Sequence, residues 1–400
     1  MSTRTVAEKN KSAEMPRPQS KARYIMIGGF LGAGKTTAVA KLARRLTDQG
    51  LRVGLITNDQ GRNLVDTALL RSQGFATEEI AGGCFCCRFN SLVEASKVLT
   101  VTAAPEIFIA EPVGSCTDLV ATVTYPLRRL YGENYTIAPL SVLVDPIRAR
   151  RIFGLEDGGS FSEKVLYIYR KQLEEADFIV VSKCDLLDGP ELETLRAAVA
   201  RRYPQTEVLA VSARTGKNLE AWFERIIRGE QAPRATMAVD YDLYADGEGL
   251  LGWLNCTAHL TSQRAFDSDK FLKRLAGEIQ KRLRTRRAEI AHLKITLSPD
   301  DGWGDLAVAN LVRNDFVPEL SLELEGPVKS GQLIINLRAE AAPDVLGATV
   351  RHGLVAAAKA SPTLKATLDH LEHFRPGRPQ PTHRDEKVAV RTGRHVGTRP

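Results

Sequence analysis

The chain has 400 residues, enough for two or three domains, and 43% of them are hydrophobic, an ordinary fraction for a globular protein. No apolar run reaches the roughly 20 residues that a membrane span needs, and the polar N-terminus has no apolar core of the signal-peptide kind. We therefore expect a cytoplasmic protein that does not associate with a membrane. The net charge of +7 is concentrated in the tails and comes without a binding motif, so we do not expect nucleic acid as a partner.

Strand-like and helix-like patterns alternate through the first half of the chain. Residues 1–22 are polar, and we predict that they are disordered. Apolar runs such as "RYIMIGGF", "RVGLITND" and "DFIVVSKCD" follow, separated by helical patterns such as "TTAVAKLARRLTDQG". Runs without strict alternation are typical of a parallel sheet covered on both faces. The fold class predicted for residues 23–230 is α/β with a mainly parallel sheet.

A second unit is predicted for residues 231–374. Its first part, "GEQAPRATMAVDYDLYADGEG", is interpreted as a linker or entry strand. Five alternating segments, a long basic helix over residues 267–290 and a helix over residues 342–360 then favour a smaller C-terminal α+β domain. "LDHLEHF" is interpreted as a helix end that carries His370 and His373 on one face. The Pro- and Arg-rich residues 375–400 are expected to form an unstructured basic tail.

The segment "GGFLGAGKT" lies between an apolar strand and the start of a helix, where a phosphate-binding loop (P-loop) belongs. Its glycines let backbone N–H groups point at a phosphate, and the helix N-terminus adds positive potential. We expect Lys35 to bridge the β- and γ-phosphates and Thr36 to give its hydroxyl to Mg²⁺. The predicted nucleotide-binding residues of this loop are Gly29, Gly32, Ala33, Gly34, Lys35, Thr36 and Thr37.

A Mg²⁺ site also needs a carboxylate at the end of a neighbouring strand. Glu111 in "IFIAEPVG" fits, because Gly114 follows three residues later and its N–H can sense the γ-phosphate. Asp145 in "VLVDP" is the competing carboxylate, with capping of the strand end as its other role. Asp59 in "LITNDQG" is predicted either to position the attacking water or a Mg²⁺-bound one, or to begin a turn.

Two later segments predict recognition of guanine. In "VVSKCD", Asp185 can accept hydrogen bonds from N1–H and the 2-amino group of guanine, a donor pair that adenine lacks. Lys183 can lie along the base, and Ser182 stands where Asn is usual. "VSARTGKNL" follows, where the backbone of Ser212 and Ala213 can meet guanine O6. The order of these segments after a P-loop favours GTP over ATP.

"GGCFCCRFN" holds half of the six cysteines of the chain within residues 84–87. In the cytoplasm such a group indicates metal binding rather than disulfides. Thiolates suit Zn²⁺, and three of them leave one tetrahedral position open for transfer of the metal or for a fourth ligand. We predict that Cys84, Cys86 and Cys87 bind a transition metal: Zn²⁺, Co²⁺ or another. Cys116 and Cys256 are interpreted as packing residues.

The chain resembles the CobW-type GTPases, relatives of the hydrogenase- and urease-maturation GTPases. The resemblance is carried by four motifs in this order: "GGFLGAGKTT", "GGCFCC", "IFIAEPVG" and "SKCD". The resemblance covers residues 24 to about 228. It implies a weak, metal-linked GTPase, that is, a metallochaperone or an activator of a client metalloprotein. The C-terminal half does not match the usual signature of the family, and its His-rich stretches are missing.

Our main hypothesis is a slow GTPase that binds GTP or GDP with Mg²⁺ and whose thiol site is coupled to the state of the nucleotide. Lys35, Asp59 and Glu111 are its predicted catalytic residues. Two alternatives stay open: an ATP-using P-loop transferase with structural zinc, and a non-catalytic nucleotide-gated adaptor. The metal in vivo, the client and the oligomeric state, including a homodimer, stay open as well.

Overall fold

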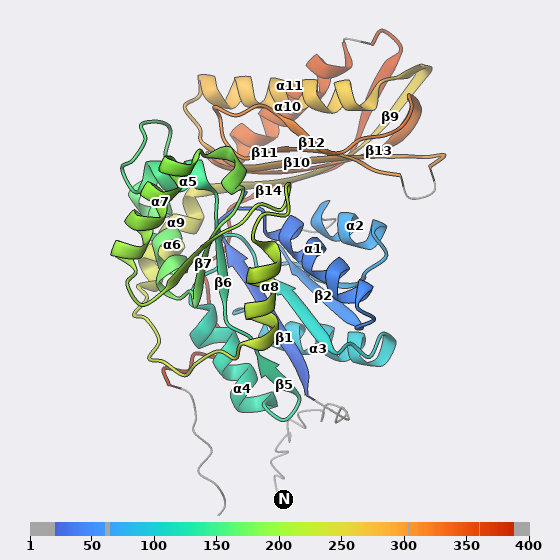
Figure 1. Ribbon diagram of the computed structural model, residues 1–400. Coiled ribbons are helices and arrows are strands. Elements are labelled where there is room, and N and C mark those ends of the chain that lie inside the picture. Colours follow the sequence, from blue (N-terminus) through green and yellow to red (C-terminus); the bar gives the residue numbers. More distant parts are fainter. Residues whose placement is uncertain (1–20, 61–64, 303–304, 360, 388–400) are drawn as a thin grey trace, which may run out of the picture.

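The computed structural model describes residues 21–60, 65–302, 305–359 and 361–387. Two sheets, each with its own helices, lie one above the other (Figure 1). The predictions for residues 1–20 and 388–400 fall outside the described residues. Within the described ranges, no helix is both long enough and apolar enough to cross a membrane.

The N-terminal sheet is parallel and has the strand order β3-β2-β4-β1-β6-β7-β8, with β5 beside β1. Its strands are β1 (Ala22–Gly29), β2 (Val53–Asn58), β3 (Ala76–Ile80), β4 (Ile107–Glu111), β5 (Tyr135–Ile137), β6 (Ser141–Val144), β7 (Phe178–Val181) and β8 (Glu207–Ala210). The parallel α/β fold predicted from the apolar runs is confirmed.

Helices cover both faces of this sheet (Figure 1). They are α1 (Lys35–Asp48), α2 (Val65–Ser72), α3 (Phe89–Thr102), α4 (Tyr125–Tyr131), α5 (Pro146–Ile152), α6 (Glu163–Glu174), α7 (Gly189–Arg202) and α8 (Leu219–Arg228), with a π-helical turn η1 (Val120–Thr124) and a 3-10 turn η2 (Cys184–Leu186). The central strands are buried on both sides, so their sequences are mainly apolar, whereas the edge strands β3 and β8 are partly exposed and carry Glu residues.

The C-terminal sheet is antiparallel and has the strand order β12-β11-β10-β13-β9-β14. Its strands are β9 (Leu251–Phe266), β10 (Ile290–Pro299), β11 (Ala307–Leu311), β12 (Glu319–Leu322), β13 (Val328–Glu340) and β14 (Leu364–Phe374). Its helices α10 (Ser268–Thr285) and α11 (Pro343–Ala358) cover one face, and the other face is turned toward the N-terminal sheet (Figure 1). The α+β layer predicted for this half is confirmed.

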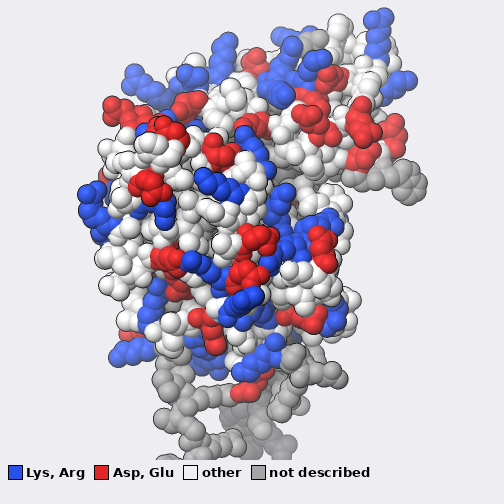
Figure 2. Space-filling view, viewed as in Figure 1, with Lys and Arg blue, Asp and Glu red and all other residues white. Residues whose placement is uncertain are grey.

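The alternation of side chains along β10 explains how the two sheets meet. Leu293, Ile295 and Leu297 belong to the apolar core under α10 and α11. Because successive side chains in a strand point to opposite faces, His292 and Lys294 point toward the N-terminal domain, where both line a pocket. On the face of the molecule shown in Figure 2, basic and acidic side chains are interspersed.

The segment interpreted as a linker contains a helix, α9 (Tyr241–Leu250). It packs on α6 so closely that a Cβ on Gly247 would lie 2.3 Å from the carbonyl oxygen of Lys164. The sequence does not predict this helix, because its two glycines lower the helix propensity. Burial of Tyr244 stabilises the helix in the folded protein. The domain boundary near residue 230 therefore stays a proposal, since α9 lies beyond it and still packs on the N-terminal domain.

Two further expectations differ from the structure. "LDHLEHF" is part of strand β14, so His370 and His373 do not share a helix face; His370 lies near Glu372, and His373 near Asp344. Pairing of β14 with β9 over its whole length determines this strand. The segment 375–387, expected to be unstructured, is described and makes hydrogen bonds to the N-terminal domain, as set out below.

Candidate functional site

The P-loop joins β1 to α1. Gly29 has a φ of +131°, and a Cβ there would lie 2.3 Å from the carbonyl oxygen of Leu143, so only glycine fits. Gly34, also at positive φ, precedes α1. Lys35 and Thr36 are buried at the start of this helix, at the floor of a cavity of about 720 Å³. The strand, loop and helix therefore have the arrangement that a phosphate-binding loop requires.

Three oxygen-bearing side chains meet beside the P-loop. The Thr36 hydroxyl lies 3.0 Å from Glu111 Oε1 and 2.7 Å from Asp66 Oδ1. Glu111 ends β4, as predicted, and Asp66 lies in the first turn of α2. Glu111 Oε2 is buried, and within the described part of the chain no hydrogen-bond partner satisfies it. This donor set fits a Mg²⁺ ion, which prefers carboxylate and hydroxyl oxygens.

Burial and charge set the protonation of this group. Burial, and then the neighbouring Asp66 carboxylate, raise the pKa of Glu111 to about 7. Burial also acts to raise the pKa of Asp66, but the Lys294 ammonium outweighs it and holds that pKa below its usual range. Burial lowers the pKa of Lys35. Added positive charge beside Glu111 would favour its carboxylate form.

Asp145, the competing carboxylate, makes contacts of a different kind. Its Oδ1 accepts a hydrogen bond of 3.1 Å from the Arg148 N–H, which caps α5, and pairs with Arg313 Nη1 at 2.9 Å. Its Oδ2 pairs with Lys183 Nζ at 2.9 Å. Asp145 therefore has the capping role considered for it and joins the C-terminal domain to the pocket.

The residues expected to meet the base lie at the other end of the cavity. Lys183, at a φ of +47°, donates to the carbonyl oxygen of Gly32 at 2.9 Å. Ser182 donates to the carbonyl oxygen of Ala33 at 2.7 Å, so this departure from the usual Asn supports the P-loop. Asp185 lies 3.7 Å from the guanidinium of Arg214. Ser182, Lys183, Asp185 and Ala213 all line the cavity, and Ser212 anchors the turn that leads to Ala213.

The C-terminal sheet forms the opposite wall of the cavity. Lys294 lies beside Thr36 and Asp66, and Arg338 pairs with both oxygens of Asp59 at 3.1 and 3.2 Å. Asn336 Oδ1 accepts a hydrogen bond from the Val65 N–H at the start of α2. The water-positioning role predicted for Asp59 stays a prediction, and its carboxylate is fixed by the C-terminal domain.

The thiol loop brings its three sulfurs together. Cys84 Sγ lies 2.8 Å from Cys86 Sγ and 3.2 Å from Cys87 Sγ, and Cys86 and Cys87 are 3.7 Å apart. The Cys87 and Arg88 N–H groups both donate to the carbonyl oxygen of Cys84, which turns the chain so that adjacent cysteines face one point. This cluster could hold a metal ion.

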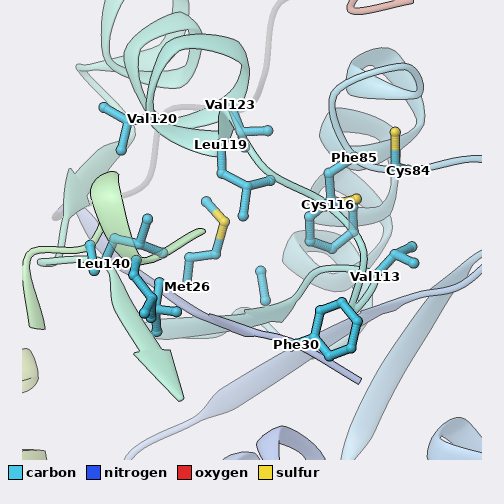
Figure 3. Close-up of a cluster of buried hydrophobic side chains, with 14 of the residues drawn as sticks. Met26, Phe30, Cys84, Phe85, Val113, Cys116, Leu119, Val120, Val123 and Leu140 are labelled. Carbon is cyan, nitrogen blue, oxygen red and sulfur yellow. The ribbon is translucent and has the colours of Figure 1, made fainter. Parts of the chain in front are cut away.

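A fourth thiol, that of Cys116, interacts with Cys84 from outside the loop. Hydrogen bonding from Cys116, followed by that from Cys86 and Cys87, lowers the pKa of Cys84 well below its usual range. Hydrogen bonding with Cys84 raises the pKa of Cys86 well above its usual range and that of Cys87 to about 11. Cys84 and Cys116 lie among the side chains of Phe85, Val113 and Leu119 in a buried cluster (Figure 3).

Two short connections join the cavity to the thiols. Asn58, which lines the cavity, donates through Nδ2 to the carbonyl oxygens of Ile80 at 2.9 Å and Gly83 at 2.7 Å. Cys116 lies two residues after Gly114, which contacts the P-loop so closely that a Cβ would lie 2.9 Å from the Leu31 nitrogen. A displacement of Asn58 or Gly114 would therefore be transmitted to the thiol loop through one or two contacts.

The C-terminal segment 375–387 lies across the thiol loop. The Gln380 N–H donates to Cys87 Sγ at 3.1 Å, and the Thr382 N–H donates to the carbonyl oxygen of Cys86 at 2.8 Å. Arg384 pairs with the buried Asp118 at 2.8 Å. Cys87 is only partly buried, so this segment covers the most accessible of the three thiols.

Sequence reasoning missed Asp66, Lys294, Cys116 and the segment 375–387. Asp66 could have been predicted from the sequence, because it is the next carboxylate after Asp59. Lys294 offers no such signal, since 258 positions separate it from Thr36. Cys116 is buried in the apolar core, as its interpretation as a packing residue implies, and sequence reasoning did not foresee its interaction with Cys84.

The fold and the site define a P-loop nucleotide-binding domain, and comparison with known proteins identifies its kind. Residues 23–210 match the family model "CobW/HypB/UreG, nucleotide-binding domain". This part of the chain is therefore similar to the nucleotide-binding domain of the CobW/HypB/UreG proteins, which confirms the resemblance seen in its motifs.

Two curated proteins and one solved structure similar to this chain each share less than 30% sequence identity with it. The zinc chaperone CobW of a Sinorhizobium species is 29% identical over 221 residues, covering 50% of this chain and 61% of that protein. The zinc chaperone CobW of Pseudomonas aeruginosa is 26% identical over 245 residues, covering 53% and 62%. A solved structure, the hydrogenase maturation factor HypB of Archaeoglobus fulgidus, is 20% identical with a TM-score of 0.34, covering 51% and 87%. The chain thus spans about three fifths of the length of the curated relatives it matches.

Proposed function

We propose that this protein is a GTP-dependent metal carrier. It binds GTP with Mg²⁺ in the cavity between its domains, hydrolyses GTP slowly, and carries Zn²⁺ or a similar ion on Cys84, Cys86 and Cys87 for delivery to a client metalloprotein. One observation supports this most: Asn58 lines the P-loop cavity and donates a hydrogen bond of 2.7 Å to the carbonyl oxygen of Gly83, the residue before Cys84.

The P-loop side of the proposal assigns one role to each group. The Lys35 ammonium and the N–H groups at the start of α1 bind the phosphates. Thr36 Oγ1 and Glu111 would hold Mg²⁺, which supplies positive charge against the phosphate oxygens. Gly114, which contacts the P-loop, would respond to the presence of a terminal phosphate.

The thiol side treats the metal as cargo. Three thiolates bind a soft divalent ion and leave one position of its tetrahedron for another ligand. Cys116, whose thiol interacts with Cys84, is the candidate within the protein for that position. A client that offers its own thiolate or imidazole would compete with Cys116, so the fourth ligand is the place where transfer begins.

Selectivity for guanine tests the nucleotide assignment. We expect GTP to bind at least about a hundredfold more tightly than ATP, because an unpaired Asp185 carboxylate would reject adenine. Asp185→Asn should remove that preference, whereas Asp188→Asn, at the exposed N-cap of α7, should not. Competition against labelled GTP with the wild type and both variants measures this.

Other outcomes would favour a different function. Similar displacement by ATP and GTP in the wild type would support an ATP-using transferase with structural zinc. Tight GTP binding without phosphate release in a single-turnover experiment, with metal and client present, would instead support a non-catalytic adaptor.

A further inference from the structure

Lys294 extends from β10 of the C-terminal sheet into the nucleotide cavity. Its ammonium pairs with the Asp66 carboxylate and donates a hydrogen bond of 3.2 Å to Thr36 Oγ1. The side chain is buried, and its neighbours Leu293 and Ile295 anchor the strand in the core below α10 and α11. A residue of the second domain is therefore held within the P-loop site of the first.

The oxygens around Lys294 are the ones proposed to hold Mg²⁺. Thr36 Oγ1 is shared by Asp66, Glu111 and the Lys294 ammonium. An ammonium and a divalent cation cannot use the same oxygens, because two positive charges a few ångströms apart repel strongly in a buried site. Binding of GTP with Mg²⁺ therefore requires the Lys294 ammonium to leave this position.

The terminal phosphate of GTP is the anion within reach of the displaced ammonium. Lys35, which binds the β- and γ-phosphates in a P-loop, is close enough for the charge of Lys294 to add to the effect of burial in lowering its pKa. The long lysine side chain can move by a few ångströms without any change in β10. Contact with the phosphate would keep the buried ammonium paired.

Two other basic groups of this wall, Arg338 and His292, are committed or neutral, and Lys273 also lines the cavity. Arg338 donates to the carbonyl oxygen of Leu254 at 2.6 Å, pairs with Asp59, and lies 4.2 Å from the centre of the Trp253 ring. Burial, followed by the charge of Lys294, lowers the pKa of His292 well below its usual range, so its imidazole is neutral at pH 7. Lys294 is thus the charged side chain of this wall that lies beside Thr36 and can move to a bound phosphate.

We propose that Lys294 is a nucleotide-sensing residue, whose ammonium exchanges Asp66 and Thr36 for the terminal phosphate of bound GTP. It would thereby tell the C-terminal domain whether the nucleotide is a triphosphate or a diphosphate, and would supply in cis a positive charge for phosphoryl transfer. The inference rests on the proposed function as a GTP-binding protein. It also identifies the contact that α2 loses when GTP binds, since Asp66 lies on that helix.

The test compares Lys294→Met, which keeps the shape of the side chain without the charge, with Lys294→Arg. Affinities for GDP and for a non-hydrolysable GTP analogue are measured by calorimetry with Mg²⁺. We expect Lys294→Met to weaken binding of the analogue at least about tenfold without weakening binding of GDP, because only the triphosphate meets Lys294. Lys294→Arg should recover most of the loss. Lys281→Met, at an exposed position of α10, is the matched control.

A second readout needs no nucleotide. Mn²⁺ alone, followed by electron paramagnetic resonance, should bind more tightly to Lys294→Met than to the wild type, by about tenfold, because Asp66 and Glu111 lose their competing cation. A purely structural lysine would lower the melting temperature without changing the ratio of analogue to GDP affinity. An unchanged ratio together with unchanged Mn²⁺ affinity would overturn the inference. Failure of the wild type to bind GTP would instead overturn the proposed function.

Discussion

Cys116 interacts with Cys84, one of the three thiols of the cluster. It is buried, and it lies on the segment that follows Glu111 and Gly114 rather than on the thiol loop. A metal bound by all four sulfurs would therefore fix the position of the segment expected to sense the γ-phosphate. This makes Cys116 both a candidate ligand and, beside Asn58, a second connection between metal and nucleotide.

The contribution of Cys116 can be measured with Co²⁺ as a spectroscopic probe. We expect Cys116→Ala to lower the affinity for Zn²⁺ or Co²⁺ by about 10- to 100-fold and to reduce the sulfur-to-cobalt charge-transfer absorption by about a quarter, since one of four thiolates is lost. Cys256→Ala, which removes a buried thiol of the C-terminal core, should leave both unchanged. Identical spectra for Cys116→Ala and wild type would show that the fourth ligand comes from elsewhere.

Residue-level prediction succeeded where the partners are close in sequence. The three thiols and the P-loop lie on continuous segments, so spacing alone predicts their proximity. Thr36 and Glu111 could be paired because Thr36 lies at the start of the helix after the P-loop and Glu111 ends a neighbouring strand of the parallel sheet. Lys294 and Cys116 could not be placed, because their contacts depend on how two domains and two loops pack, which no local pattern specifies.

At the scale of elements, the segment 375–387 is the one whose behaviour differs most from its composition. Its Pro- and Arg-rich sequence has no large apolar side chains with which to form a core, so its composition predicts disorder. Backbone hydrogen bonds to Cys86 and Cys87 and the pair between Arg384 and Asp118 hold it in place instead. Interactions of this kind cannot be seen in composition.

This segment should control the rate at which metal leaves. We expect a chain truncated after Phe374 to lose Zn²⁺ to a chromogenic chelator about tenfold faster than the full chain, because Cys87 becomes accessible and loses the Gln380 N–H. Removal of residues 388–400 alone is the matched control and should change little.

A pair of point variants isolates the hydrogen bond itself. Gln380→Pro removes the donating N–H, whereas Gln380→Ala keeps it. Faster release in Gln380→Pro alone would support a direct role of this bond, and equal release from the truncated and full chains would show that the segment does not limit metal exchange.

At the scale of the whole molecule, the nucleotide cavity lies between two domains that both contribute to it. The C-terminal sheet contacts the P-loop domain through Arg313 on Asp145, Arg338 on Asp59 and Lys294 on Asp66. Each of these carboxylates lies close to the expected nucleotide. A change from GTP to GDP would therefore alter the interface between the domains as well as the thiol loop.

The fold of both domains could be predicted, because buried parallel strands and one-sided antiparallel strands leave different patterns in a sequence. Their mutual arrangement could not, since it is held by long-range charged pairs and by helix α9 packed on α6. The cavity walls contributed by the C-terminal domain were missing from the sequence-based site for that reason.

The most direct measurement of the central claim is the affinity for Zn²⁺ of the wild-type protein, determined once with Mg²⁺ and a non-hydrolysable GTP analogue and once with Mg²⁺ and GDP. We predict that the two affinities differ by at least about fivefold, the lower end of ordinary coupling between sites, and that Zn²⁺ changes the relative affinity for the two nucleotides by the same factor. Asn58→Ala should reduce that factor, because it removes the hydrogen bond to the thiol loop. Equal Zn²⁺ affinities in the two nucleotide states would contradict the account.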